Sequence, residues 1–372
     1  MKIGILTIHR IYNHGSFLQS FAVKSIIQGI LPNAEVEFLD WPSEDKSSKP
    51  VYNIPKKRIA KPSGLKFFCH KLLGHNVYCR DVELAWLHAC FGQNYRKLCA
   101  DYLAVSPESN YSTDYDLIVV GSDESFNCTQ DDAPWDTTLC FNLIGKNVIS
   151  YAASFGYSTL KRLDDYGLSD IVKSGLSSYK SISVRDRNSQ EIVKALTGRE
   201  AAVHLDPVLV FDYSRFIPDI KIKSDFILVY NYLNRINDPD FITRIKAFAK
   251  KNRLKIISIF EFCPWADNNI VLSSFEVLAY FKKAKYVVTD TFHGAVMSIK
   301  FNKQFIAFVR ESNRNKLHYL IDSFGLGDRI LTDATEFESK IKAPVDWIPV
   351  NDKIAYERNR TMSYFSDNLK KI

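Results

Sequence analysis

The chain has 372 residues, 46% of them hydrophobic and 13% aromatic, and a formal net charge of +7. This length suits two or three globular domains, and the composition excludes a disordered chain. No apolar run is long enough to span a membrane, and the N-terminus lacks signal-peptide architecture, so we expect a cytoplasmic protein. The seven cysteines form no Cys-x-x-Cys pair, which argues for reduced thiols and against structural zinc; we expect neither a metal nor a cofactor.

Residues 1–212 alternate predicted strands and helices, as in a Rossmann-like domain. The predicted elements are strands at 2–7, 35–40, 116–120, from 148, from 181 and at 205–211, with helices at 17–30 and 190–196. The loop at 9–16 has turn chemistry, and Ser16 is the predicted cap of the first helix. It is not a G-x-G-x-x-G fingerprint, so it specifies no dinucleotide.

Residues 43–105 form a predicted insertion with a basic, partly helical character. Between Lys46 and Lys71 the charged residues are all lysine or arginine, with apolar residues interleaved or adjacent. Such a segment can lie on an anionic membrane surface at the inner face of the membrane, or it can be a solvated loop and helix covering the domain. No nucleic-acid-binding motif accompanies the charge, so we expect no nucleic-acid partner.

Polar residues follow several of these strands. Asp123 follows the strand at 116–120, and Arg185 leaves the end of the strand that starts at 181. Ligands bind at the carboxyl ends of strands in open α/β sheets, so both residues are candidates, although Asp123 could simply cap a turn. Arg185 and Arg187 would share one face of an extended stretch and suit a phosphate or carboxylate, unless they form ordinary surface salt bridges.

A linker at 221–224 introduces a second predicted α/β domain, residues 213–345. Its predicted strands are 226–230, 255–259, a run ending near Thr289, and 304–308, and its predicted helices are 239–252 and 274–283. Residues 346–372 contain a charged amphipathic helix at 351–369, which we expect to pack back on the N-terminal domain.

His293 lies on the strand-to-helix turn of this second domain. Thr291 precedes it and Gly294 follows it, and the new helix offers backbone N–H groups to an anion. A histidine there could hold an anion and move a proton, although it could also merely cap or pack at the turn. Arg314 and Lys316, after the strand at 304–308, would add positive charge to the same crevice.

Two such halves in succession predict an α/β fold in which two Rossmann-like domains face a cleft, a GT-B-like architecture. At the level of motifs the chain resembles the polysaccharide pyruvyl transferase family. The matching segments, in order, are residues 13–19, 121–127, 149–156, 182–186, 205–207 and 289–294. Some members have Arg-Leu where this chain has Thr291 and Phe292, and Glu124 stands where the family pattern has Gln.

The resemblance implies transfer of an enolpyruvyl unit from phosphoenolpyruvate to a sugar, forming a pyruvate ketal on a cell-surface glycan precursor. We expect a lipid-pyrophosphate-linked or nucleotide-linked sugar as the acceptor. The expected site comprises His293 as general acid and Asp123 as base; Arg185, Arg314, Lys316, Thr291 and Gly294 on the donor; and Asn13, Gly15, Gln19, Ser122 and Glu124 on the acceptor. Two alternatives stay open: a GT-B glycosyltransferase that uses a nucleotide sugar, and a non-catalytic scaffold for glycan assembly.

Overall fold

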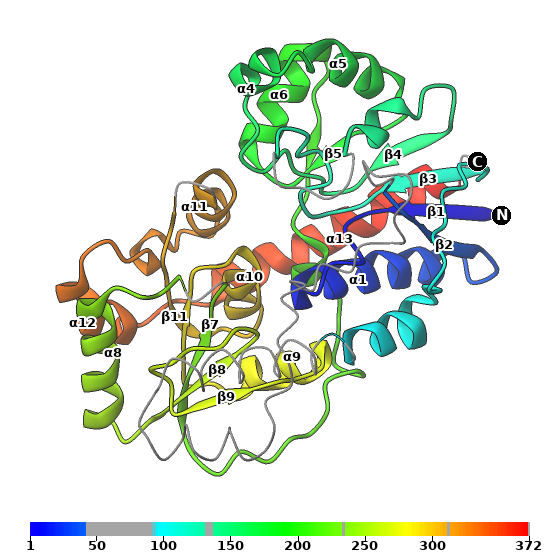
Figure 1. Cartoon of the computed structure of the whole chain (residues 1–372). Coiled ribbons are helices and arrows are strands. Elements are labelled where there is room, and N and C mark those ends of the chain that lie inside the picture. Colours follow the sequence, from blue (N-terminus) through cyan, green and yellow to red (C-terminus); the bar gives the residue numbers. More distant parts are fainter. Residues whose placement is uncertain (42–91, 93, 131–136, 233–234, 311–312, 371–372) are drawn as a thin grey trace, which may run out of the picture.

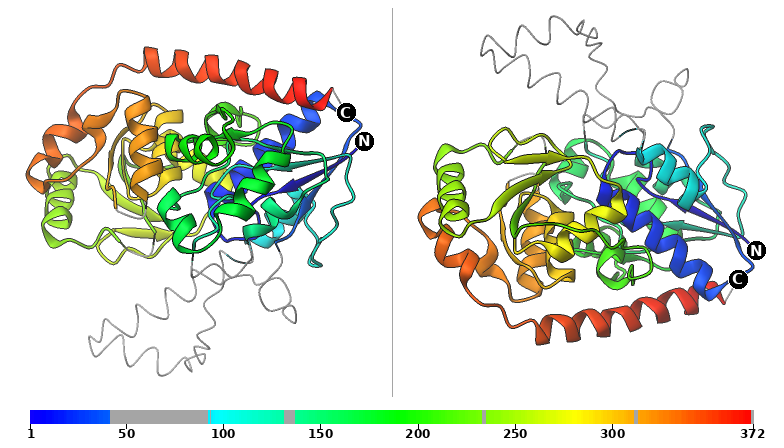
Figure 2. Two further views of the ribbon diagram at one scale, coloured as in Figure 1. Left: turned by 90° about the horizontal axis from the view of Figure 1, so that it is seen from above. Right: turned by 90° about the horizontal axis from the view of Figure 1, so that it is seen from below.

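The structure, a computed structural model, describes residues 1–41, 92, 94–130, 137–232, 235–310 and 313–370. Most of the predicted insertion at 43–105, including the basic segment 46–71, lies outside the described residues. The rest of the chain forms two α/β units, and the long helix α13 (Ile348–Leu369) runs along both of them (Figures 1 and 2). Among the described helices, none combines the length and the apolar character needed to cross a membrane.

The N-terminal unit is built on a four-stranded parallel sheet in the order β2-β1-β3-β4. Its strands are β1 (Lys2–Leu6), β2 (Glu35–Leu39), β3 (Leu117–Val120) and β4 (Val148–Ser150), and single bridges extend it to β5 (Ser183–Val184), which pairs with β6 (Ala202–Val203). Its helices are α1 (His14–Ile30), η1 (Cys99–Leu103), η2 (Thr137–Asn142), α4 (Leu160–Asp165), α5 (Ser169–Ser178), α6 (Arg187–Thr197) and α7 (Pro207–Val210). From β1 the chain continues to β2 on one side of β1, and it then crosses to β3 on the other side. Ligands in open α/β sheets bind where the strand order reverses in this way, so we expect a crevice at the carboxyl ends of β1 and β3.

The C-terminal unit repeats this plan with a five-stranded parallel sheet in the order β11-β10-β7-β8-β9. Its strands are β7 (Phe226–Tyr230), β8 (Lys255–Ile259), β9 (Asn268–Ile270), β10 (Tyr286–Thr289) and β11 (Gln304–Ala307). Its helices are α8 (Pro239–Lys251), α9 (Ser274–Lys283), α10 (Phe292–Lys300), α11 (Arg314–Ser323), η4 (Gly327–Arg329), η5 (Ala334–Glu336) and α12 (Phe337–Lys342). Here the strand order reverses between β7 and β10. We therefore expect the ligand crevice of this sheet at the carboxyl ends of these two strands, beside the turn that precedes α10.

Two predictions about local structure are wrong. The first helix begins at His14, because the Asn13 side chain, not Ser16, accepts the Gly15 and Ser16 amides at 2.8 and 3.3 Å. Residues 205–211 are not a strand: Pro207–Val210 form helix α7, capped by Asp206, whose Oδ1 accepts the Val208 amide at 2.9 Å. An Asp cap followed by proline at the first helical position overrides the strand preference of the valines.

One hydrophobic core joins the two units. The rings of Phe17 and Phe21 on α1 lie 5.5 and 5.2 Å from the ring of Phe275 on α9, and Phe216 packs on Phe21 at 4.8 Å. Helix α13 adds polar ties to the N-terminal sheet, where the Tyr364 hydroxyl donates to the Ser150 carbonyl at 2.6 Å. These contacts hold the two units together with the carboxyl ends of their sheets facing each other.

Candidate active site

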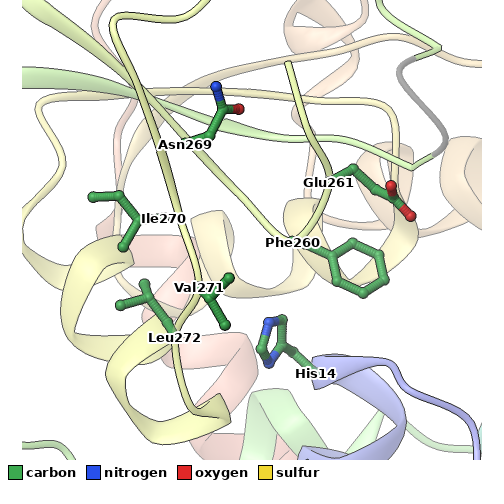
Figure 3. A pocket seen from close by; sticks show the side chains of 7 residues that line it. All are labelled: His14, Phe260, Glu261, Asn269, Ile270, Val271 and Leu272. Atoms are coloured by element: carbon green, nitrogen blue, oxygen red, sulfur yellow. The ribbon is translucent and has the colours of Figure 1, made fainter. Parts of the chain in front are cut away.

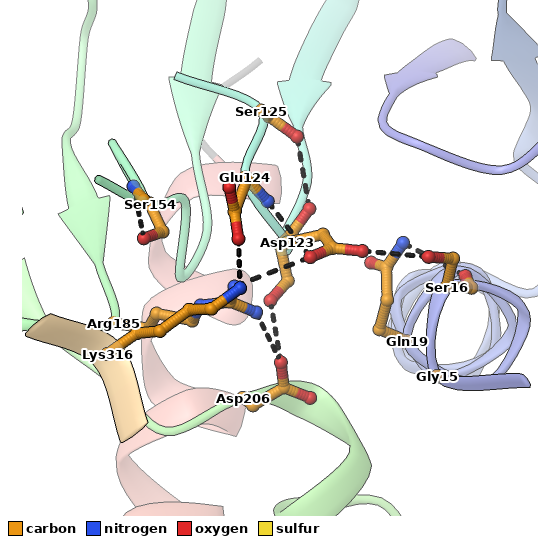
Figure 4. A network of polar contacts seen from close by, with 12 residues as sticks. Gly15, Ser16, Gln19, Asp123, Glu124, Ser125, Ser154, Arg185, Asp206 and Lys316 are labelled. Atoms are coloured by element: carbon orange, nitrogen blue, oxygen red, sulfur yellow. Dashed lines mark hydrogen bonds and ion pairs between the residues drawn. The ribbon is translucent and has the colours of Figure 1, made fainter. Parts of the chain in front are cut away.

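Side chains from both units converge between the carboxyl ends of the two sheets (Figure 4). The N-terminal unit supplies the turn after β3, the end of β5 and the cap of α7. The C-terminal unit supplies the first turns of α10 and α11. Because each contributing residue sits at a strand end or helix start, its backbone is fixed by the sheet while its side chain is directed outward from the sheet edge.

Arg185 is the centre of a buried ionic network. Its side chain is 1% exposed, and its Nη1 and Nη2 lie 2.9 Å from Asp206 Oδ2 and 3.4 Å from Asp123 Oδ1. Burial opposes its charge, but the two carboxylates outweigh burial and raise the pKa of Arg185 above its ordinary value. The guanidinium carbon also lies 4.2 Å from the centre of the Phe292 ring, a cation–π distance. Arg185 therefore remains a fixed, buried positive charge.

Asp206, which our sequence analysis did not include among the site residues, links this network to His293. Its Oδ2 accepts from Arg185 and from Ser122 Oγ at 3.2 Å, and it lies 3.5 Å from His293 Nε2. Burial raises the pKa of Asp206, but His293 and Arg185 more than offset burial and hold that pKa at about 2. Asp206 is thus a carboxylate that orients both Arg185 and His293.

His293 lies in the first turn of α10, as expected, with 9% of its side chain exposed. Its Nε2 is buried and faces Asp206 Oδ2 at 3.5 Å, and within the described part of the chain it makes no hydrogen bond. A Cβ built on Gly15 would come within 2.7 Å of the His293 Cβ and closer still to its ring, so the first turn of α1 packs tightly against this histidine. The imidazole is therefore held between Gly15 on its Nδ1 side and Asp206 on its Nε2 side.

Asp123 adopts a left-handed backbone conformation, with φ of 75°, at the tip of the turn after β3. Its Oδ2 accepts from Ser16 Oγ at 2.8 Å, and its Oδ1 accepts from the Glu124 amide at 3.0 Å. Burial raises its pKa, but the nearby cations, Arg185 first, lower that pKa below the ordinary value. A strained, ionised carboxylate in such a turn is typical of functional sites.

An ion pair between Lys316 and Glu124 bridges the two units. Lys316 extends from α11 and lies 5.9 Å from the centre of the Phe292 ring, on which Arg185 also lies. Glu124 also accepts from Asn127 Nδ2 at 2.8 Å. The Phe292 ring therefore collects two cations, one from each unit, beside His293.

Several expected ligand-binding residues also have structural roles. Thr291 caps α10 and its Oγ1 accepts the Gly294 amide at 2.9 Å, so that amide is already used. Asn13 caps α1, and Gln19 is fully buried, where its amide nitrogen donates to Thr7 and Ser16 at 3.0 Å each.

Among the expected cations, the structure separates Arg185 from Arg187. Arg187 begins α6 and pairs with Glu191 on the exposed face at 2.9 Å, so the two guanidinium groups do not act as a pair. Arg314 begins α11 and is exposed, two residues before Lys316. Within the described ranges, no three His, Cys, Asp or Glu side chains are grouped as a metal site requires.

A family model described as polysaccharide pyruvyl transferase matches residues 13–312. No match was found among curated protein sequences. Among solved structures, the chain is similar to "S. aureus MnaA-UDP co-structure" at 8% identity and a TM-score of 0.55, over 100% of this chain and 97% of that one. It is also similar to the "Glycotransferase of kitacinnamycin" at 10% identity and a TM-score of 0.52, over 100% and 98% of the two chains. These likenesses confirm the predicted α/β fold of two Rossmann-like domains in a GT-B arrangement, and at such identities they show the fold alone.

Proposed function

Because the chain belongs to the polysaccharide pyruvyl transferase family, we propose that it transfers an enolpyruvyl group from phosphoenolpyruvate to a sugar diol and closes it into a pyruvate ketal. The acceptor is a galactose-type residue of a lipid-linked precursor, and the product enters a capsular or other cell-surface polysaccharide. The enzyme works in the cytoplasm, peripherally at the inner face of the membrane. The observation that carries this proposal is the meeting of Arg185, Lys316 and His293 around the Phe292 ring.

The donor needs cations because it carries both a phosphate and a carboxylate. Lys316 is the direct ligand: a donor anion replaces Glu124 on its ammonium group, since the two compete for the same charge. Arg185 contributes a buried positive charge beneath the donor, and its ion pairs with Asp123 and Asp206 keep it in place. Cations fixed in advance stabilise negative charge on the departing phosphate without reorganisation.

His293 is the general acid. It gives a proton to the methylene carbon of the donor, and one acceptor hydroxyl forms a bond to the adjacent carbon. Asp206, 3.5 Å away, pairs with the imidazolium form and orients the ring. Phosphate then leaves as its C–O bond breaks, and the second hydroxyl closes the ketal. Asp123 accepts the proton of the first hydroxyl and passes it to the departing phosphate, and the proton of the second hydroxyl restores His293.

The test measures phosphate release from phosphoenolpyruvate with galactose-bearing acceptors in the wild type and in His293→Ala. We expect release to fall by about 10²- to 10⁴-fold in the variant. His318→Ala is the matched control, because the His318 side chain is 44% exposed on α11 and pairs with Asp322 in its own helix. This control should keep full activity.

Donor binding, measured by calorimetry in the same samples, completes the test. Donor binding without release identifies a wrong acceptor and calls for a wider panel. No donor binding overturns the proposal, as does equal release by the wild type and His293→Ala. Turnover with a uridine or guanosine nucleotide sugar and no need for phosphoenolpyruvate would identify a GT-B glycosyltransferase instead.

A further inference from the structure

Two helices of very different length hold His293. Helix α1, whose Gly15 packs against the imidazole, has 17 residues and is buried along most of its length. Beside its start, the concavity lined by His14 and Phe260 encloses about 10 Å³, room for about one water molecule (Figure 3). Helix α7 has only four residues, and its cap Asp206 (Figure 4) lies 3.5 Å from His293. The α1 side of the imidazole is thus closely packed, whereas the α7 side depends on what holds a single helical turn.

A single turn such as α7 is not stable by itself, because few hydrogen bonds offset the ordering of its backbone. The Phe211 amide donates to the Pro207 carbonyl at 3.0 Å. At the other end the Asp206 side chain accepts the Val208 amide at 2.9 Å. At about 1.5 Å per residue the helix is about 6 Å long, so a shift at its last carbonyls reaches Asp206. The position of Asp206 therefore depends on the groups that hold the far end of α7.

Two cations hold that far end. Lys300 Nζ donates to the Phe211 carbonyl at 2.6 Å and to the Leu209 carbonyl at 3.2 Å. Arg358 Nε, on α13, donates to the Val210 carbonyl at 2.7 Å. The last carbonyls of a helix have no partner within the helix and carry its negative end, so cations are well suited to bind them. Together Lys300 and Arg358 bind three consecutive carbonyls at the end of α7.

Lys300 belongs to the same helix as His293. His293 is the second residue of α10 and Lys300 is the ninth and last, and every residue from Phe292 to Ile299 is buried. Helix α10 thus contacts α7 at both ends, through His293 and Asp206 where the two helices begin and through Lys300 where they end. The two contacts are about 10 Å apart along α10, so together they fix both the position and the tilt of α7.

The charge of Lys300 itself disfavours folding. Burial first, and the charge of Arg358 second, lower the pKa of Lys300 to about 7, and Asp212 opposes them. Among the residues that the structure describes, no carboxylate forms an ion pair with Lys300, and its Nζ lies 5.2 Å from the centre of the Tyr213 ring. Taking an ammonium group out of water without a counter-ion reduces stability. The contribution of Lys300 therefore lies in the carbonyls that it holds.

We propose that Lys300 and Arg358 are positioning residues, which hold the end of α7 and thereby keep the Asp206 carboxylate against the imidazole of His293. Arg185 and Ser122 bind the same Asp206 oxygen, at 2.9 and 3.2 Å, so a released α7 follows them rather than His293. The imidazole then loses the carboxylate that orients it. The effect on turnover rests on the proposed function, whereas the effect on the imidazole does not.

The test uses Lys300→Met and Arg358→Met, which remove each cation and keep an unbranched side chain. Arg358 is exposed, so Arg358→Met keeps the test valid if Lys300→Met does not fold, as circular dichroism will show. Lys303→Met is the matched control, because Lys303 also donates to a carbonyl, that of Lys282 on α9, at 2.7 Å.

The first readout needs no substrate. NMR spectra of protein with ¹⁵N-labelled histidine record the imidazole of His293, whose signals are identified by their absence from His293→Ala. We expect these signals to shift in both α7 variants and to stay in place in Lys303→Met. In an active enzyme, kcat for phosphate release should fall by about 10- to 100-fold in the α7 variants, and the KM for the donor should stay within about twofold of the wild type.

The outcomes separate this inference from the proposed function. Shifted His293 signals in the α7 variants alone uphold it even if phosphoenolpyruvate is never turned over. His293 signals that keep their wild-type positions in either folded variant overturn it, as does a shift of the same size in Lys303→Met. In an active enzyme, a raised KM for the donor with an unchanged kcat would also overturn it, because Lys300 and Arg358 would then act on donor binding.

Discussion

Gly15→Ala tests whether the position of His293 carries the activity. The new Cβ would lie under 3.0 Å from His293 atoms, closer than real Cβ atoms approach their neighbours. The imidazole must therefore shift by about 1 Å, and a displacement of that size in a catalytic group costs about 100-fold in rate. The same substitution gains about 0.5–1 kcal/mol of helix propensity, while crowding costs about 1–3 kcal/mol. We thus expect a large loss of activity with only a small loss of stability.

Gly29→Ala is the control on the same helix, because nothing lies within 4 Å of a Cβ built there. It should raise the free energy of unfolding by about 0.5–1 kcal/mol and leave turnover unchanged. The assay pairs kcat/KM for phosphate release with urea denaturation followed by tryptophan fluorescence. Wild-type kcat/KM in Gly15→Ala would refute the reasoning, because it would mean that His293 acts from elsewhere or does not act. A loss of activity in Gly29→Ala as large as that in Gly15→Ala would refute it equally.

Two further substitutions probe the ionic network. Asp206→Asn removes a carboxylate whose pKa is about 2 rather than 3.8, since burial raises it but His293 and Arg185 lower it further. The ionised form thus stabilises the fold by about 2 kcal/mol above pH 4, and this contribution is lost as the pH falls toward 2. Urea denaturation should give Asp206→Asn a lower free energy of unfolding than the wild type at pH 7, and the difference between the two should be smaller at pH 3. An equal difference at both pH values would contradict this account. Glu124→Gln releases Lys316 from its ion pair, so the KM for phosphoenolpyruvate should fall several-fold in steady-state assays. Glu338→Gln, which breaks an exposed pair with Lys251, is its control, and an unchanged or higher KM in Glu124→Gln would argue against Lys316 as the donor ligand.

The sequence predicted the sheets well because their strands are buried on both faces. Strand β7 has the predicted bounds Phe226–Tyr230 and all its residues are buried, so the apolar run was unambiguous. The strand-to-helix turn that carries His293 was predicted in the same way. The buried run of β10 ends in threonine and aspartate, and small residues follow in α10. Strand β9 was missed, because Asn268–Ile270 is short and partly exposed and shows no apolar run.

The site was less predictable, because its geometry depends on distances between residues far apart in the chain. Asp206 sits in an Asp-Pro pair that could have indicated a helix cap, but the valines after it favoured a strand. Nothing local to Gly15 indicates that it packs on His293, about 280 residues later. Glu124 was expected to bind the acceptor, and no local pattern around it indicated its ion pair with Lys316, 192 residues later.

The aromatic contacts between α1 and α9 affect how the protein unfolds. Phe17, Phe21, Phe216 and Phe275 bury their rings against one another across the two units, and each buried aromatic side chain contributes about 1.5–3 kcal/mol. Separating the units would expose these rings together, so a folded but opened state should account for fewer than about one molecule in a thousand. Heating should therefore melt both sheets in one cooperative step, and a chain divided at residues 221–224 should not yield two halves that each fold alone.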